Sequence, residues 1–253
     1  MQVLSASQFF LVSDVLSLCI AAFAAASLFF WFGRSQVSSH YKTALTITGL
    51  VTFIAFYNYW RLFDSWDATY TVVNGVISAT GVPYNQIYRY TDWLLTVPLL
   101  LIELILVMRL PQAETISRAW KLGSAAALMI LLGYFGQVSG ANDSAPRLIG
   151  GVLSMIPFLY IVFALYSGLG EAIERQPETA RGLVRLARNL TVVAWFFYPI
   201  VYFLPFVVSF DGGTITTVIQ IGYAVADLTA KVIFGLLIYT IAVRKSEAEG
   251  MKA

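Results

Sequence analysis

Five ionisable side chains lie inside apolar stretches of this sequence, at Arg89, Asp92, Glu103, Asp227 and Lys231. Placing a charge deep in a bilayer costs about 2.5 kcal/mol or more, so ionisable groups at such depth are functional candidates by default. A buried lysine amine is either paired with an anion or available as a nucleophile, because burial favours its uncharged form. The neighbours of Lys231 decide between these two roles.

Spacing gathers four of these groups on two helix faces. Asp227 lies four residues before Lys231, one helical turn away, so it can reach a charge on that lysine. Arg89, Asp92 and Thr96 follow one another at intervals of three and four residues and also share a face.

Glu103 stands apart from the others. It lies eleven residues beyond Asp92 and returns to nearly the same helix face about 16 Å further along the axis. Simple charge pairing would account for the other four groups but leaves Glu103 without a cation. A lone carboxyl group among leucine, isoleucine and valine residues is expected to be protonated at neutral pH, so it can donate a proton and take one back. This asymmetric placement is what vectorial proton transfer requires.

Composition defines the class of protein that must position these groups. Of 253 residues, 58% are hydrophobic and 12% are charged, whereas soluble domains carry about 25% charged residues. The chain is therefore predicted to be a membrane protein. A formal net charge of +2 does not indicate a nucleic-acid partner. The single cysteine excludes an intramolecular disulfide.

Seven apolar runs approach or exceed the roughly 20 residues that a membrane-spanning helix needs. They predict one all-α domain over residues 1–253, a seven-helix transmembrane bundle in a lipid bilayer. The predicted spans are Gln8–Phe32, Lys42–Leu62, Gln86–Met108, Ser117–Val138, Arg147–Leu169, Leu190–Val208 and Thr216–Val243.

Basic residues predict the orientation of this bundle, because lysine and arginine are retained on the cytoplasmic side. Twelve of the sixteen follow the first, third, fifth and seventh spans, and only Arg61, Arg89 and Arg147 lie toward the other side. The N-terminus is therefore expected outside, in a multi-pass protein of the cell membrane, with Asp92 in the outer half and Glu103 in the inner half. The twelve are Arg34, Lys42, Arg109, Arg118, Lys121, Arg175, Arg181, Arg185, Arg188, Arg244, Lys245 and Lys252.

The link between the second and third spans contains a hairpin signal. Alternating β-prone residues in 69–73 and 76–80 flank Asn74-Gly75, the dipeptide that favours a two-residue turn. We expect a short β-hairpin on the outer face.

Aromatic residues recur at helical spacing on the sixth span, at Trp195, Tyr198 and Tyr202. Taken alone, such a stripe is more typical of ordinary packing. Together with Trp93 it could line a flat apolar slot beside Lys231, and Pro199 marks a kink or hinge there. An aldehyde-bearing polyene condensed on the lysine would fit such a slot.

Three motifs resemble those of microbial (type 1) rhodopsins, especially the proteorhodopsin and xanthorhodopsin branch. They are Arg-Tyr-Thr-Asp-Trp-Leu-Leu-Thr-Val-Pro-Leu-Leu in 89–100, Trp-Phe-Phe-Tyr-Pro in 195–199 and Ala-Asp-Leu-Thr-Ala-Lys in 226–231. The resemblance covers all seven spans. It implies a bacteriorhodopsin-like fold and all-trans retinal bound to Lys231 as a protonated Schiff base, in a pocket that includes Trp93, Leu100, Trp195, Tyr198, Pro199 and Tyr202.

The same resemblance implies roles for the charged residues. Asp92 corresponds to the proton acceptor and main counterion, and Asp227 to the second counterion. Thr96 corresponds to a hydroxyl that hydrogen-bonds Asp92, Arg89 to the arginine that orders outer waters, and Glu103 to the cytoplasmic proton donor. This pattern implies a light-driven outward proton pump, which is an ion transporter rather than an enzyme. Leu100 falls at a colour-tuning position that is associated with green absorption.

The sequence departs from that branch on the second span, where Asn58 replaces the histidine that usually pairs with the acceptor aspartate. An amide cannot share the proton. The remaining partners of Asp92 are mostly cationic and favour its ionised form, so we expect the pump to work into acidic pH. The outer end of the last span also lacks a glutamate of the kind that forms the release group in haloarchaeal pumps, so release is expected through Arg89 and water.

Other outcomes stay open from the sequence. A sensory photoreceptor or a light-gated ion channel of the same fold would share most of these residues, although Glu103 argues against a sensory role. A homo-oligomer is expected. A carotenoid antenna beside the retinal is a further possibility, because Gly150-Gly151 could open a groove, but small residues there more often serve helix packing.

Overall fold

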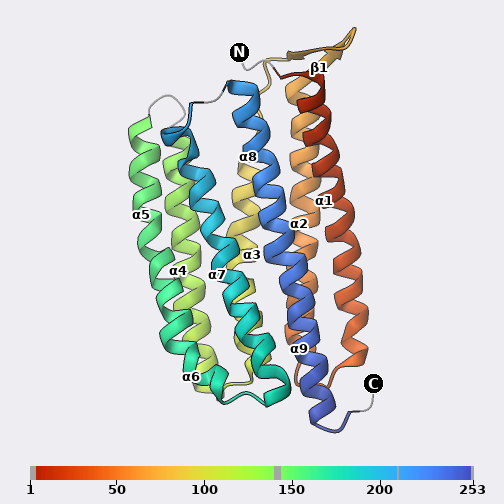
Figure 1. Ribbon diagram of the computed structural model, residues 1–253, viewed down its shortest axis with the longest axis vertical. Coiled ribbons are helices and arrows are strands. Elements are labelled where there is room, and N and C mark those ends of the chain that lie inside the picture. Colours follow the sequence, from red (N-terminus) through yellow and green to blue (C-terminus); the bar gives the residue numbers. More distant parts are fainter. Residues whose placement is uncertain (1–3, 140–143, 210, 252–253) are drawn as a thin grey trace.

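The helices of the computed structural model form seven roughly parallel rods, as predicted (Figure 1). The structure describes residues 4–139, 144–209 and 211–251, so Lys252 lies outside the described residues. Two rods contain a π-helical turn, at 164–168 and 228–233. The helices are α1 Ala6–Gly33, α2 Lys42–Thr69, α3 Ile87–Met108, α4 Gln112–Ser139, α5 Ser144–Phe163 running into α6 Leu169–Glu174, α7 Glu178–Val207, and α8 Gly212–Asp227 running into α9 Phe234–Ala248.

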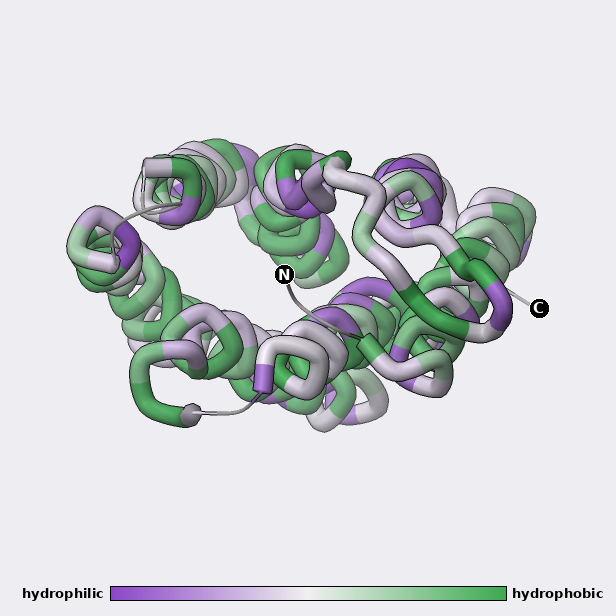
Figure 2. Tube along the Cα trace, turned by 90° about the horizontal axis from the view of Figure 1, so that it is seen from above, coloured by the Kyte–Doolittle hydropathy of each residue, from purple (hydrophilic) through white to green (hydrophobic). Residues whose placement is uncertain are grey.

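Six of these rods are long and apolar enough to cross a membrane. The seventh, α2, is as long as α1 but more polar, and it packs against both α1 and α3. Viewed along their axes, the rods are arranged in an oval, and hydrophobic residues occur along every rod (Figure 2). The many exposed Leu, Ile, Val and Phe side chains are those that a lipid-facing surface needs.

The predicted hairpin is confirmed. Strands β1 (Tyr70–Val73) and β2 (Val76–Ala79) pair antiparallel, with Val73 opposite Val76. Asn74 and Gly75 have φ values of 53° and 77°, the positive values that this two-residue turn requires. We call the end of the bundle that carries these strands the hairpin end, and the opposite end, where α9 finishes, the C-terminal end (Figure 1).

Helices α4 and α5 approach closely through two glycines. A Cβ atom on Gly150 would lie 2.4 Å from Cα of Gly136, a distance that no side chain tolerates. On Gly151, a Cβ would lie 2.6 Å from the ring of Tyr202 and 2.7 Å from that of Phe203. Gly150 therefore allows α4 and α5 to approach closely, which is the usual role of small residues between membrane helices, and Gly151 lies against two aromatic rings of α7.

Candidate functional site

Lys231 lies between two carboxylates in the middle of the bundle. Its Nζ donates to Oδ2 of Asp92 at 2.8 Å and to Oδ1 of Asp227 at 2.7 Å. None of these three side chains is more than 1% exposed. Charges so far from water persist only when they are paired and hydrogen-bonded, so the ammonium and its carboxylates depend on one another.

Asp227 is held by fixed donors. Besides Lys231, it accepts hydrogen bonds from Tyr59 (Oη to Oδ2, 2.7 Å), Trp93 (Nε1 to Oδ1, 3.1 Å) and Tyr198 (Oη to Oδ1, 2.5 Å). These donors come from α2, α3 and α7, so three other helices fix the carboxylate of Asp227, the last residue of α8. Donors of this kind stabilise the ionised form of a carboxylate.

Asp92 is held more loosely. Its Oδ2 accepts from Lys231, but its buried Oδ1 has no hydrogen-bond partner among the described residues. An oxygen without a donor can take up a proton without first breaking a hydrogen bond. The two carboxylates beside Lys231 therefore differ in what they can do.

Thr96 and Arg89 lie near Asp92 but make contacts other than the expected ones. The Thr96 hydroxyl donates to the main-chain oxygen of Asp92, at 2.8 Å, and not to its carboxylate. The buried Arg89 donates through Nη2 to Oε1 of Gln220 at 2.7 Å and through Nη1 to the Tyr59 hydroxyl at 3.4 Å. Arg89 thus places a positive charge on the hairpin side of the carboxylate pair.

Glu103 lies toward the C-terminal end of the same helix, α3. It is fully buried, and neither of its carboxyl oxygens has a hydrogen-bond partner among the described residues. An uncompensated anion in such surroundings would be very costly, so the group is best accommodated as a neutral acid. The structure thus separates Glu103 from the charged cluster around Lys231.

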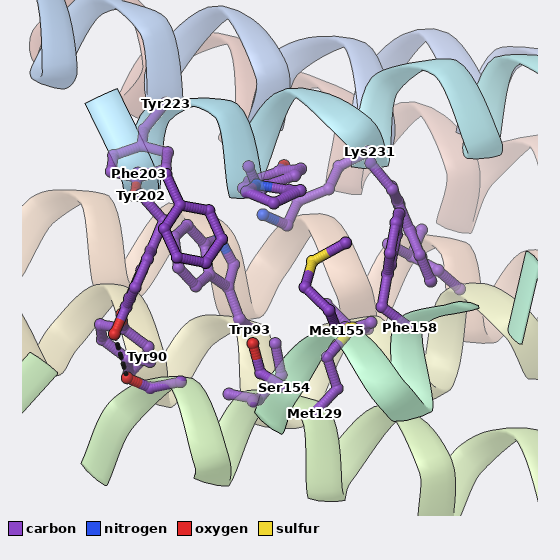
Figure 3. A pocket seen from close by; sticks show the side chains of 17 residues that line it. Tyr90, Trp93, Met129, Ser154, Met155, Phe158, Tyr202, Phe203, Tyr223 and Lys231 are labelled. Carbon is purple, nitrogen blue, oxygen red and sulfur yellow. Dashed lines mark hydrogen bonds between the residues drawn. The ribbon is translucent and has the colours of Figure 1, made fainter. Parts of the chain in front are cut away.

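An apolar cavity opens next to the Lys231 amine. Figure 3 shows the side chain reaching into this space, with Trp93, Met155 and Phe158 around it. The lining includes every pocket residue that the sequence predicted: Trp93, Leu100, Trp195, Tyr198, Pro199 and Tyr202. The Trp93 and Tyr198 rings pack edge to face with centroids 5.1 Å apart.

Some of the site was missed by sequence reasoning. Tyr59, Gln220, Met129, Met155 and Phe158 all contact the charged cluster or line the cavity. A phenol beside Asn58 in an apolar span was a usable signal for Tyr59. The methionines and phenylalanine gave none, because such residues are equally common at lipid-facing positions.

The backbone around Lys231 is also unusual. Residues 228–233 form a π-helical turn, which inserts an extra residue into the helix. Such turns are rare and occur frequently at functional sites. The sequence predicted a helix here but gave no sign of the π-helical turn within it.

Asn58 is buried on α2, and its Nδ2 donates to the main-chain oxygen of Ile54 at 3.0 Å. The hydrogen bonds of the described residues include none between Asn58 and Asp92. The amide is thus satisfied within its own helix, and the carboxylate is left to its cationic neighbours.

A seven-helix bundle with a buried lysine between two aspartates, beside an aromatic cavity, defines the class of microbial type 1 rhodopsins. Residues 11–245 match the family model described as bacteriorhodopsin-like protein. The chain belongs to this family and is a multi-pass protein of the cell membrane, as the sequence predicted.

Individual relatives agree with this assignment. Green-light absorbing proteorhodopsin of Gamma-proteobacterium EBAC31A08 is 34% identical over 233 residues, which span 90% of this chain and 85% of that protein. Bacteriorhodopsin of Halobacterium salinarum is 30% identical over 82% of this chain and 74% of that protein. The structure of xanthorhodopsin, described as a light-driven ion pump with dual chromophore, superposes with a TM-score of 0.93 at 43% identity and covers all of both chains. A thermophilic rhodopsin superposes with a TM-score of 0.94 at 44% identity, covering 99% of this chain and 100% of that one.

Proposed function

We propose that this protein is a light-driven outward proton pump that carries all-trans retinal on Lys231. The observation that carries the proposal is the unequal placement of proton-binding groups along one axis. On the hairpin side of Lys231 lies a charged cluster in which one carboxylate oxygen of Asp92 has no donor among the described residues. On the other side lies Glu103, a buried carboxyl group that likewise has no hydrogen-bond partner there. The xanthorhodopsin relative is itself described as a light-driven ion pump.

The residues present fit retinal. The cavity offers an apolar, aromatic lining for a polyene, and the Lys231 amine at its edge faces two carboxylates that can neutralise a positively charged nitrogen. When bound, retinal supplies light absorption and a change of shape that alters the surroundings of the Lys231 nitrogen. Leu100, in the cavity wall, is proposed to favour green absorption.

On the hairpin side, Asp92 is proposed to accept the proton that leaves the Lys231 nitrogen. No donor among the described residues reaches its Oδ1, whereas Asp227 is proposed to keep its negative charge because four donors surround it. Thr96 anchors the local helix geometry through the main-chain oxygen of Asp92. Proton transfer to a positioned carboxylate is ordinary general acid–base chemistry.

On the other side, Glu103 is proposed to return a proton to the Lys231 nitrogen and then to be refilled from the cytoplasm. A buried neutral acid can act in this way without leaving a stable anion behind. Direction then depends on access to the nitrogen switching from Asp92 to Glu103 during the cycle.

Orientation and release complete the proposal. The hairpin end faces outward, because the basic links lie at the C-terminal end. The proton leaves past Arg89 and Gln220, which border a cavity of about 220 Å³ near the hairpin end.

Asp92 is proposed to stay ionised in weakly acidic solution, because Asn58 supplies no shared proton and Lys231 favours the anion. A homo-oligomer is proposed. A carotenoid antenna stays a prediction, and the xanthorhodopsin relative is described as having a dual chromophore.

The proposal is tested by expressing the chain with retinal in cells and following external pH under illumination. A pump acidifies the medium under illumination. This acidification should appear without a protonophore and disappear when a protonophore is added. A light-gated channel would move protons only down an imposed gradient, and a sensory photoreceptor would produce a pigment without sustained pH changes. Lys231→Met should give no pigment and no pH response. Repeating the measurement from pH 8 to pH 5 tests activity in acid.

A further inference from the structure

A second buried lysine lies at the C-terminal end of the bundle, outside the cluster around Lys231. Lys245, on α9, is 5% exposed. Its Nζ donates to the main-chain oxygens of Val107, at 2.9 Å, and Met108, at 3.4 Å, and to Oε1 of Gln176, at 2.8 Å. The ion pairs of the described residues include none with Lys245. A buried ammonium held by neutral oxygens is costly, so packing alone explains it poorly.

The two main-chain oxygens belong to the last residues of α3. Arg109 has a φ of 55° and ends the helix in the left-handed conformation, so the carbonyls just before it lack the usual helical partners. A cation at this position satisfies them and lies at the negative end of the helix dipole. Lys245 therefore fixes the end of the helix that carries Glu103.

Gln176 connects the same point to a third segment. It is buried in the link between α6 and α7, and its Nε2 donates to the main-chain oxygens of Met108, at 3.1 Å, and Ala172, at 3.0 Å. We call Lys245, Gln176 and the carbonyls of Val107 and Met108 the C-terminal clamp. It joins α3, α9 and the α6–α7 link by hydrogen bonds.

A more exposed layer covers the C-terminal clamp. Glu249 accepts hydrogen bonds from the Tyr41 hydroxyl at 2.5 Å and from Nη1 of Arg109 at 2.7 Å. The Tyr41 ring lies 5.4 Å from the Lys245 amine, and Arg175 borders the same surface pocket. The charged groups facing Lys245 are thus arranged on the solvent side of the clamp.

Glu103 lies on the other side of the clamp. It precedes Val107 by four residues, one helical turn or about 6 Å along α3. Because Glu103 is fully buried, a proton arriving from the C-terminal end has to pass through packed protein, and the clamp lies at that end of α3. We infer that Lys245 is a positioning residue: it holds the end of α3 so that the route to Glu103 is closed at rest, and release of its contacts admits the proton that refills Glu103. This inference rests on the proposed role of Glu103.

The test measures proton uptake by the full-length pigment in lipid vesicles after a flash, with a pH-indicator dye. Lys245→Met keeps the length of the side chain and removes the amine. We expect uptake about tenfold faster or more, which corresponds to the loss of one hydrogen bond to a charged group. Its rate should also rise in proportion to the bulk proton concentration, whereas wild-type uptake, limited by opening of the clamp, should depend weakly on pH.

A matched control is Arg244→Met, which removes a neighbouring cation whose side chain is 57% exposed and pairs with Glu247. Its uptake should match that of the wild type in rate and pH dependence. Gln176→Ala, which leaves the ammonium and both carbonyls in place, should accelerate uptake in the same direction but less, and it carries the test if Lys245→Met does not fold. Uptake that is unchanged or slower in the clamp variants would overturn the inference.

A Glu103→Gln background separates failure of the clamp from failure of the proposed donor. There, protons must reach the Lys231 nitrogen from the C-terminal end without Glu103, and Lys245→Met should still accelerate that step. Equal rates with and without Lys245→Met would reject the clamp and leave the donor assignment standing. Wild-type kinetics in Glu103→Gln alone would reject the donor, and acceleration by Lys245→Met in this background would still support a closed route.

Discussion

The two halves of the proposed proton path hold their carboxyl groups in opposite ways. Around Lys231, Asp227 receives four hydrogen bonds from four helical segments, and Asp92 shares the same ammonium. Around Glu103, the described residues place no donor within hydrogen-bonding geometry of either oxygen, and the Thr48 hydroxyl is the polar group nearby. Both regions are fully buried, so the difference lies in polar contacts and not in access to water.

This difference indicates which protonation state each of the two regions stabilises. Fixed donors in a region of low dielectric stabilise negative charge, and they need not reorganise when a proton moves. A carboxyl group surrounded by apolar side chains is instead stable while it keeps its proton. We therefore propose that the region around Lys231 stabilises negative charge and that the region around Glu103 holds a proton.

Asp92→Asn removes a carboxylate from the cluster around Lys231 and should have the largest effect on pumping. The amide cannot accept the proton, so light-driven acidification should be abolished, a loss of about 10²-fold or more for a general base. Removal of a negative charge beside the Lys231 nitrogen should also shift absorption to the red. Absorption spectra and external pH recordings check both effects. Pumping that survives this substitution would refute the acceptor assignment.

Glu103→Gln should affect only the region around Glu103. The first proton release should remain, because Asp92 and Asp227 are unchanged, but the return to the resting state should slow by about 10²-fold, the usual contribution of a positioned proton donor. Flash photolysis at several pH values measures this. Glu247→Gln, an exposed carboxylate on α9, serves as the control and should leave the kinetics as they were. A change in the resting spectrum as large as that of Asp92→Asn would show that the two halves are not separate.

Tyr198→Phe should sharpen the comparison by weakening one donor to Asp227. The lost hydrogen bond is 2.5 Å long and goes to a charged acceptor, so about 1.5–3 kcal/mol of stabilisation of the anion is at stake. Three donors remain, and we expect a modest spectral shift with slower but continuing pumping. The control is Tyr160→Phe, whose ring is 44% exposed on α5. An identical spectrum in Tyr198→Phe and the wild type would mean that the donors around Asp227 do not hold its charge.

Charges at the exposed C-terminal end should matter least. Slight burial raises the pKa of Glu249, but hydrogen bonds from Tyr41, Ser38, His40 and Arg109 outweigh it and lower the pKa to about 2. The stabilisation is therefore present above the ordinary value of 4.5 and is lost as pH falls toward 2. Because exposed pairs are screened, Glu249→Gln should cost no more than about 1 kcal/mol at neutral pH. Melting temperatures of the two proteins should converge near pH 2, and a difference that is constant with pH would contradict this.

Much of the fold was predictable from the sequence, because long apolar runs and an Asn-Gly turn have few alternative structures in a membrane. The errors lie at helix ends. Helix α2 continues to Thr69, seven residues beyond the predicted Leu62, because the prediction followed the apolar run and the helix extends past it through Asp64 and Asp67. Helix α8 begins at Gly212, where Asp211 accepts a hydrogen bond from the Thr214 amide, a capping signal that the apolar pattern did not include.

The candidate site was predictable in its positions along the helices but not in its contacts. Spacing put Asp227 one helical turn from Lys231, and the orientation predicted from the basic residues put Asp92 in the outer half of the bundle. That Asp227 gathers the donors while one oxygen of Asp92 has none depends on Tyr59 and Tyr198, which reach the site from other helices. The C-terminal clamp had no sequence signal either, because the burial of a lysine near a helix end depends on which carbonyls lie opposite.

The rod formed by α8, the π-helical turn and α9 runs unbroken from Gly212 to Ala248, a length of 37 residues. Lys231 lies close to its midpoint, so in a bilayer its nitrogen should experience about half of the membrane voltage. Moving one charge across 100 mV costs about 2.3 kcal/mol, so each half of the path would work against about 1 kcal/mol at that voltage. A high membrane potential would therefore slow both the delivery of a proton to Lys231 and its departure. The electrical work would be divided about equally between these two steps.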